Sequence, residues 1–240
     1  MEKLKRQGIH TDYVAVCSPN YLHDAHIRFG LRIGADVICE KPVVLNPWNI
    51  DALMEIEKET GRHVYTILQL RLHPAIIELR EKIKNGPADK IYDIKLRYIT
   101  SRGHWYHTSW KGNIEKSGGI ATNIGVHFFD MLLWLFGPLK ESSVTQSDSK
   151  TATGTLQLER ATVNWTLSID KDLLPEGWIG SGKKTWRRLL INNEEFDFSD
   201  GFEHLHTAAY REILGGNIIT LEEMKPVTTL LSQIRRQSSI

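Results

Sequence analysis

Residues 13–42 read YVAVCSPNYLHDAHIRFGLRIGADVICEKP, and this stretch decides the fold class of the first part of the chain. Residues 13–17 and 35–39 are short apolar runs with β-branched side chains, which are typical of buried parallel strands. Residues 21–33 between them have the apolar spacing of a helix that packs on a core, and Gly34 follows as a stop signal. Strand, helix and strand in this order predict a right-handed crossover within a parallel sheet.

The same rhythm continues for one more helix and strand. Asn46-Pro47 begins a second helix that ends before Gly61, and residues 63–68 form a third apolar run. We therefore predict that residues 1–72 form the carboxyl-terminal half of a dinucleotide-binding domain. This half is an incomplete, Rossmann-type parallel sheet of three strands.

After about residue 74 the pattern changes to long runs of alternating polarity. Such runs, joined by tight turns such as Asn192-Asn193, predict an antiparallel sheet with one packed face. We predict strands at residues 91–100, 143–150, 153–158, 161–169 and 186–191, and helices at 75–84, 120–136, 203–214 and 221–235. The predicted fold class is thus α/β plus α+β, with a large, mostly antiparallel open sheet for substrate binding and oligomerisation in residues 73–240.

Composition and charge limit the functions that the chain can have. A hydrophobic share of 41%, a charged share of 25% and a formal charge of +1 are typical of a soluble globular protein, without the basic patch that nucleic acid or an anionic membrane would attract. The first ten residues lack the apolar core of a signal peptide, which predicts a cytoplasmic location. We expect Cys17 and Cys39, each in an apolar run, to be reduced core thiols.

Polar clusters follow two of the predicted parallel strands. Ser18, Asn20 and His23 follow the first strand, and Glu40 and Lys41 follow the second. Open α/β sheets bind ligands outside the carboxyl ends of their strands, so these side chains are candidate binding residues. Lys41 is placed to act as a hydrogen-bond donor or proton relay, although a solvated loop lysine would give the same pattern.

A second polar cluster lies on the apolar helix at residues 120–136. Asn123, His127 and Asp130 are four and three residues apart and share one face of that helix. His127 is either an acid–base group that faces a polar cavity or a hydrogen-bonded core histidine. For His104 and His107 no third ligand with metal-site spacing is apparent, so we predict no metal.

In combination these motifs resemble the signatures of a known family. Ser18-Pro19-Asn20-x-x-His23, Glu40-Lys41-Pro42, and Gly118-Gly119 with Asn123-x-x-x-His127 are similar in order and spacing to those of Gfo/Idh/MocA oxidoreductases. The resemblance covers nearly the whole chain. It implies that NAD, or else NADP, accepts a hydride, that Lys41 holds the reacting hydroxyl and that His127 takes its proton. Asn123 stands where many members have an aspartate.

Longer stretches, such as KSGGIATNIGVHFFDMLLWLFG, are most similar to the members that act on UDP-sugar uronates. This likeness implies oxidation of the 3-hydroxyl of UDP-N-acetylglucosaminuronate for surface polysaccharide synthesis. Arg71, Lys111 and Tyr210 are further candidates for contacts to the phosphate or sugar of this nucleotide sugar. A homo-oligomer, a dimer or tetramer formed through the antiparallel sheet, is also expected.

The chain departs from the family pattern in one respect. No G-x-G-x-x-G occurs in the 240 residues, so the glycine-rich turn that binds the pyrophosphate is expected before Met1. Asn20, Glu40 and Lys41 would then contact only the nicotinamide half of the cofactor. Two alternatives remain open: a non-catalytic homologue that binds a sugar nucleotide or serves as an oligomer subunit, and a dehydrogenase for another sugar or for inositol.

Overall fold

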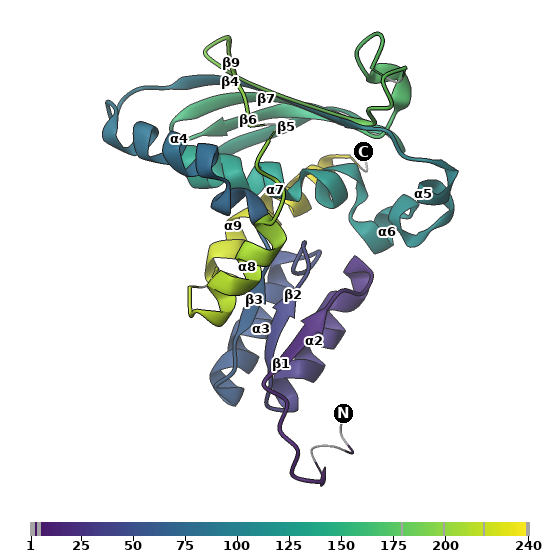
Figure 1. The fold of residues 1–240 in the computed structure, drawn as a ribbon, viewed down its shortest axis with the longest axis vertical. Helices are drawn as coiled ribbons and strands as arrows, with labels where there is room; N and C mark the ends of the chain where they lie inside the picture. The colour runs from purple at the N-terminus through teal and green to yellow at the C-terminus, as the bar shows by residue number, and fades with distance from the viewer. Residues whose placement is uncertain (1–2, 4–5, 179, 199, 218, 239–240) are drawn as a thin grey trace.

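The computed structural model describes residues 3, 6–178, 180–198, 200–217 and 219–238, arranged around two sheets (Figure 1). The smaller sheet contains β1 (Tyr13–Val16), β2 (Asp36–Cys39) and β3 (Val64–Thr66) in that order. Both strand pairs are parallel, with Val14 opposite Val37 and Ile38 opposite Tyr65. The predicted incomplete Rossmann-type sheet is confirmed.

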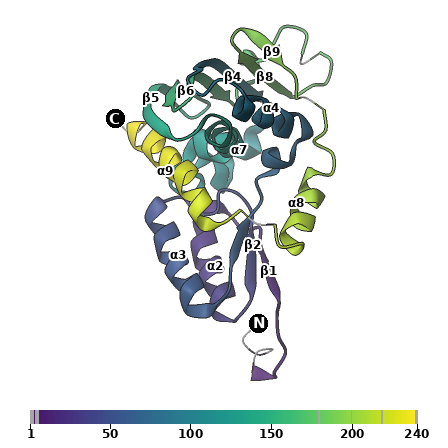
Figure 2. The same ribbon diagram turned by 90° about the vertical axis from the view of Figure 1, so that its left-hand side faces the viewer.

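Helices cover both faces of this small sheet. After a short 3-10 turn, η1 (Asn20–Leu22), α2 (His23–Arg32) and α3 (Pro47–Thr60) lie on one face, and α8 (Leu205–Leu214) lies on the other (Figure 2). Gly30 allows α2 to approach β2 closely, because a Cβ there would lie 2.6 Å from Val37 Cγ2. On the opposite face Ala209 and Ile213 of α8 pack against Ile38.

The first strand is less buried than its sequence suggests. Of the four residues in β1 only Val16 is buried, and Cys17 directly after it is exposed. Among the described residues β1 is hydrogen-bonded to β2 alone, so it is an edge strand with an open side. The prediction of a core thiol is therefore correct for Cys39, which is buried, and wrong for Cys17.

The larger sheet has the strand order β5-β6-β7-β4-β8-β9. Its strands are β4 (Tyr92–Thr100), β5 (Leu139–Ser147), β6 (Thr151–Leu158), β7 (Ala161–Ser168), β8 (Thr185–Ile191) and β9 (Glu194–Phe196). All neighbours are antiparallel except β4 and β7, which run parallel at the centre. β9 was not predicted, and β5 begins earlier than expected. Asn192 and Asn193 have φ of +52° and +68°, as a two-residue hairpin turn requires.

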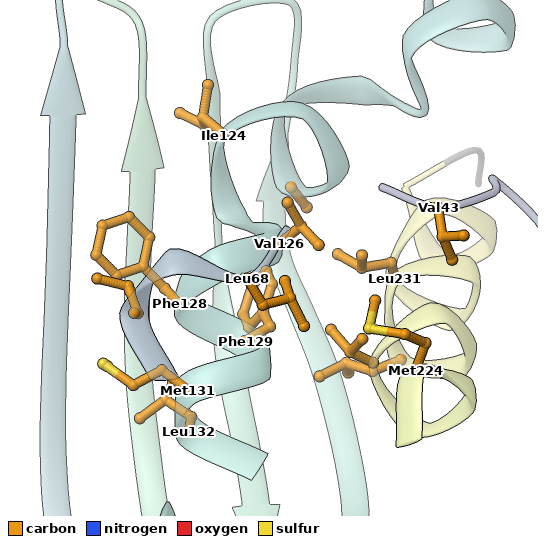
Figure 3. Packing of buried hydrophobic residues seen from close by; sticks show 14 of the residues in the cluster. Val43, Leu68, Ile124, Val126, Phe128, Phe129, Met131, Leu132, Met224 and Leu231 are labelled. Carbon is orange, nitrogen blue, oxygen red and sulfur yellow. The ribbon is translucent and has the colours of Figure 1, made fainter. Parts of the chain in front are cut away.

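The core lies beneath one face of this sheet. There α7 (Gly119–Phe136) packs on the strands, with α4 (Pro74–Asn85) and α9 (Leu221–Gln237) beside it (Figures 1 and 3). Phe129 meets Trp165 of β7 edge to face at 5.3 Å between ring centroids. The segment 114–136 is long and apolar enough to cross a membrane, but 72% of its apolar window is buried inside the protein, so it is a core helix.

The two sheets share one continuous hydrophobic cluster. Buried residues from Val16 in β1 to Ile234 in α9 belong to it. α9 connects the halves directly, because it packs on both α3 and α7. The division of the chain at residue 72 therefore stays a prediction from sequence.

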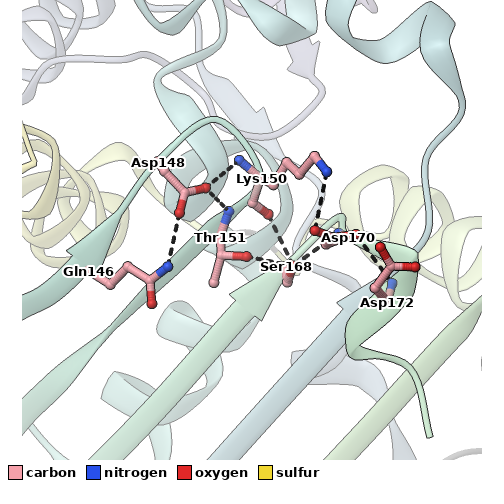
Figure 4. A network of polar contacts seen from close by, with 7 residues as sticks. All are labelled: Gln146, Asp148, Lys150, Thr151, Ser168, Asp170 and Asp172. Carbon is pink, nitrogen blue, oxygen red and sulfur yellow. Dashed lines mark hydrogen bonds and ion pairs between the residues drawn. The ribbon is translucent and has the colours of Figure 1, made fainter. Parts of the chain in front are cut away.

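One edge of the large sheet is fixed by polar contacts around the β5–β6 turn (Figure 4). Asp148 Oδ1 accepts hydrogen bonds of 2.8 Å from the backbone N–H groups of Lys150 and Thr151. Thr151 and Ser168 hydroxyls lie 2.8 Å apart across β6 and β7. A carboxylate that accepts two backbone donors holds a tight turn, which keeps this corner of the sheet in place above α7.

Candidate functional site

Lys41 joins the two halves of the molecule at the carboxyl end of β2. Its Nζ donates a hydrogen bond of 3.1 Å to the backbone oxygen of Asn123 on α7. Burial lowers the pKa of Lys41 to about 8, and the positive charges of Lys111 and Arg102 act in the same direction, while Glu40 opposes them. The alternative of a solvated loop lysine does not fit this position. A lysine with such a pKa exchanges its proton near neutral pH.

His127 lies one helical turn after Asn123, and its environment is unusual for a histidine. Its Nδ1 is buried and has no hydrogen-bond partner among the described residues, although the side chain as a whole is half-buried. Burial, followed by the nearby charge of Lys41, lowers the pKa of His127 to about 3. The imidazole is therefore neutral at physiological pH. Nδ1 is not satisfied within the protein, which favours a site residue over a hydrogen-bonded core histidine.

Asn123 is held by an aromatic residue for which the sequence predicted no role in the site. The Asn123 Nδ2 donates a hydrogen bond of 2.7 Å to Tyr106 Oη. Tyr106 belongs to α5 (His104–Thr108), is buried, and has its pKa raised by that burial. Nothing in the sequence Gly103-His-Trp-Tyr-His indicates that Tyr106, rather than one of the other three rings, turns inward.

Asn20 and His23 tie the loops of this site together. Asn20 Nδ2 donates to the backbone oxygen of Ser117, at the end of α6 (Ile114–Ser117), over 2.9 Å. His23 Nδ1 lies 2.7 Å from Pro42 O, and its Nε2 lies 2.7 Å from Ser18 O. Burial lowers the pKa of His23, although the two carbonyl oxygens favour the charged ring. Both side chains therefore stabilise the loops of the site through hydrogen bonds to backbone oxygens.

Glu40 and Tyr210 both contact His206. Glu40 Oε1 lies 3.0 Å from His206 Nε2, and the His206 ring lies 5.3 Å from the ring of Tyr210 on α8. Burial raises the pKa of Tyr210, and the negative charge of Glu40 adds to this. Tyr210 therefore lies close to the end of β2, as a substrate contact would require.

Arg71 is placed differently from its prediction as a substrate contact. It lies in η2 (Gln69–Leu72), and its guanidinium donates to both oxygens of Asp130, at 2.9 and 2.7 Å. A third bond of 3.0 Å reaches Glu223 on α9. These carboxylates occupy the guanidinium, so the structure gives Arg71 a role at the junction of η2, α7 and α9. Asn123, His127 and Asp130 all lie on α7, and Asp130 forms part of this ion pair.

Lys111 lies in η3 (Trp110–Gly112), on the segment that follows Tyr106. Its Nζ is 5.3 Å from the ring centroid of Trp105 and 5.6 Å from that of Trp110. Partial burial lowers its pKa, and the charge of Arg102 contributes. Both distances lie within the range of cation–π attraction, which fixes the position of this half-buried ammonium. No cluster of three or more potential metal ligands occurs among the residues that the structure describes.

The residues at the carboxyl end of the small sheet fit the nicotinamide end of NAD. Ser18, Glu40 and Lys41 follow the ends of β1 and β2, where open parallel sheets bind such cofactors, and the charge of Lys41 acts on His127. The glycine-rich turn for the pyrophosphate has no counterpart in these 240 residues. The fit is therefore to the reacting end of the cofactor only.

Comparisons with known proteins agree with this geometry. Residues 1–67 match the NAD-binding Rossmann fold of an oxidoreductase family, and residues 80–170 match the C-terminal alpha/beta domain of the same family, Gfo/Idh/MocA. The WlbA (WbpB) dehydrogenase from Thermus thermophilus is 44% identical to this chain, with a TM-score of 0.92 over 98% of this chain and 75% of its own. It was solved with NAD and alpha-ketoglutarate, and with NAD and UDP-GlcNAcA.

Curated relatives are more distant. D-glucoside 3-dehydrogenase from Escherichia coli is 27% identical over 54% of this chain, and inositol 2-dehydrogenase from Rhizobium meliloti is 29% identical over 62%. The matched parts span 37% and 42% of those relatives, less than half of their lengths. The two family models together match residues 1–67 and 80–170, which is more than half of the chain. The chain therefore belongs to the Gfo/Idh/MocA family of oxidoreductases.

Proposed function

We propose that this chain supplies the catalytic side chains of an NAD-dependent dehydrogenase that oxidises the 3-hydroxyl of UDP-N-acetylglucosaminuronate. The observation that carries this proposal is the hydrogen bond from Lys41 to Asn123, which brings the lysine within a helical turn of the unpaired His127. The choice of sugar is supported by the 44% identity to a dehydrogenase solved with NAD and UDP-GlcNAcA. The reaction would serve synthesis of a surface polysaccharide in the cytoplasm.

Each of the two side chains has a distinct task. The Lys41 ammonium donates a hydrogen bond to the oxygen of the 3-hydroxyl and stabilises the negative charge that develops there. His127 accepts the hydroxyl proton at Nε2, since its Nδ1 is buried and the imidazole is neutral. Bound NAD would supply the acceptor for the hydride from C3, so that a ketone remains, and Ser18, Glu40 and Lys41 would hold its nicotinamide end. The low pKa of His127 then favours release of the proton.

Calorimetric titration of the purified chain with NAD and with UDP-N-acetylglucosaminuronate tests the proposal. Micromolar binding of both ligands, followed by formation of a 3-keto product, would support it. Binding of the nucleotide sugar without NAD would instead favour the non-catalytic homologue. Tighter binding of a simple glucoside or of inositol than of the nucleotide sugar would favour a dehydrogenase for another substrate.

We also propose that the chain forms a homo-oligomer through the large sheet. In the described part of the chain no helix covers the face opposite α7 (Figure 1). This face has a hollow of about 420 Å³ lined by polar and charged side chains, including Lys95, Arg97 and Thr155. Light scattering on Arg97→Glu tests this, because a central charge reversal should shift the protein to monomer. An unchanged mass, or a wild-type monomer, would overturn it.

A further inference from the structure

The side chain of Asn123 is held at one end only. Its Nδ2 donates a hydrogen bond of 2.7 Å to Tyr106 Oη, while its backbone oxygen accepts the bond from Lys41 Nζ. Its Oδ1 has no hydrogen-bond partner among the described residues, yet unlike Nδ1 of His127 it is not buried. The side-chain oxygen of Asn123 is therefore free to accept a hydrogen bond from a bound molecule, one helical turn before His127.

Tyr106 is itself fixed by the fold of its segment. It is 2% exposed, its backbone N–H donates to Gly103 O over 3.0 Å, and its backbone oxygen accepts a bond of 3.0 Å from Ser109 Oγ. Gly112 lets the chain return close to α5, because a Cβ there would lie 2.7 Å from His107 Cα. Burial raises the pKa of Tyr106, so its hydroxyl stays neutral at physiological pH. The hydroxyl oxygen is thus a hydrogen-bond acceptor with a fixed place against α7.

The direction of an asparagine side chain depends on its partners. An amide has an acceptor end and a donor end of nearly equal shape, and half a turn about its last bond exchanges them. Because Tyr106 accepts from Nδ2, the oxygen end of Asn123 is the one left for a ligand. Without the hydroxyl the NH₂ group would be free to take that place and would meet the donors of a sugar with a further donor. Lys41 already supplies a donor at this site, so an acceptor is the complementary group.

We propose that Tyr106 is a positioning residue that leaves Oδ1 of Asn123 to accept a hydrogen bond from the sugar ring. This inference rests on the proposed function, since the ring donors would be the hydroxyl groups and the N-acetyl N–H of UDP-N-acetylglucosaminuronate. It also gives asparagine a requirement that aspartate would not have. The two oxygens of a carboxylate are equivalent, so either can face the ligand and no neighbouring hydroxyl is needed to orient them.

The test uses this equivalence of the carboxylate oxygens. Binding of UDP-N-acetylglucosaminuronate is measured by calorimetry in the wild-type chain, Tyr106→Phe, Asn123→Asp and the double variant. In the wild-type background Tyr106→Phe should weaken binding about 3-fold to 10-fold, the range for one hydrogen bond. In the Asn123→Asp background the same change should weaken it by less than about twofold. Tyr92→Phe, which removes the hydroxyl of a buried tyrosine that packs on Phe136, should leave the affinity unchanged.

A second measurement needs no ligand. By NMR, the Nδ2 protons of Asn123 should exchange with solvent about 10-fold more slowly in the wild-type chain than in Tyr106→Phe. An equal exchange rate would overturn the inference. Equal weakening of binding by Tyr106→Phe in both backgrounds, or no weakening in either, would also overturn it. If the exchange rates differ as expected but the wild-type chain binds no nucleotide sugar, the proposed function is overturned, and with it the role of Oδ1 in binding.

Discussion

Two polar sites on α7 differ sharply although they lie on one stripe of the helix. Asp130 is buried, and Arg71 donates to both of its carboxylate oxygens. His127, three residues earlier, has a buried Nδ1 with no partner in the part of the chain that the structure describes, and a pKa of about 3. The same helix therefore contains a fully paired site and an unpaired one within a single turn.

The difference separates stability from function. A buried ion pair whose groups are satisfied stabilises packing as long as both partners remain. An unsatisfied buried nitrogen costs free energy, so it persists where a ligand or a reaction uses it. We therefore expect changes at Asp130 to affect unfolding and changes at His127 to affect turnover.

His127→Gln should produce the largest effect, and that effect should be on turnover. Loss of the proton acceptor should slow NADH formation about 10²- to 10⁴-fold, as for other general bases. The free energy of unfolding should change by less than about 1 kcal/mol, because His127 makes no hydrogen bond to the described residues. His104→Gln, in the exposed part of α5, is the matched control. Unchanged turnover in His127→Gln would contradict the proposed role.

Asp130→Ala should have the opposite profile. Removing the carboxylate leaves the Arg71 guanidinium partly uncompensated at 11% side-chain exposure, which should cost about 3–5 kcal/mol of stability in urea unfolding. The exposed pair of Glu78 and Lys82 provides a control, since Glu78→Ala should leave the free energy of unfolding nearly unchanged. A loss at Asp130 no greater than at Glu78 would show that the pair does not stabilise the junction. The double variant Arg71→Met with Asp130→Leu should recover much of the loss.

Lowering the pH should destabilise the protein, because His127 is neutral in the folded state. This effect should be of intermediate size. The pKa of His127 is about 3 when folded and near 6.5 when unfolded. Below pH 6.5 the unfolded chain binds a proton that the folded chain does not, so stability is complete above 6.5 and falls with pH. The slope is about 1.4 kcal/mol per pH unit for this group. Urea midpoints between pH 6.5 and 5 should fall less steeply in His127→Gln, and parallel slopes would refute the assignment.

Most of the fold could be predicted from the sequence because its elements have strong local signals. The strand ends at Asn20 and Lys41 and the turn at Asn192 follow from apolar runs and glycine, proline or asparagine. The short strand β9 and the parallel pairing of β4 with β7 were not predicted. Pairing between strands about 70 residues apart depends on contacts that no local pattern encodes.

The site was predictable only where a motif marks it. Lys41 and His127 are marked by family signatures, whereas no pattern in the chain marks Tyr106. Its place follows from how the segment after β4 folds back onto α7. Arg71 shows the reverse case. It was predicted to contact the substrate, but its side chain pairs with Asp130, which lies 59 residues away in the sequence. The pairing state of a polar side chain is a tertiary property, and spacing alone does not reveal it.

Asn123→Asp should have the smallest effect. It places a carboxylate near His127, so that this site, like the one at Asp130, contains an acidic group. A carboxylate one turn before His127 would favour the protonated imidazole and raise the pKa of His127 by about one unit, against the opposing charge of Lys41. The fold should tolerate the change, because Tyr106 can donate its hydroxyl proton to the new carboxylate, and Lys41 bonds to the backbone oxygen of residue 123. An NMR titration of His127 measures the shift directly. An unmoved pKa would mean that Lys41 and burial alone set the basicity of His127, and a large loss of stability would mean that the amide of Asn123 is needed for packing.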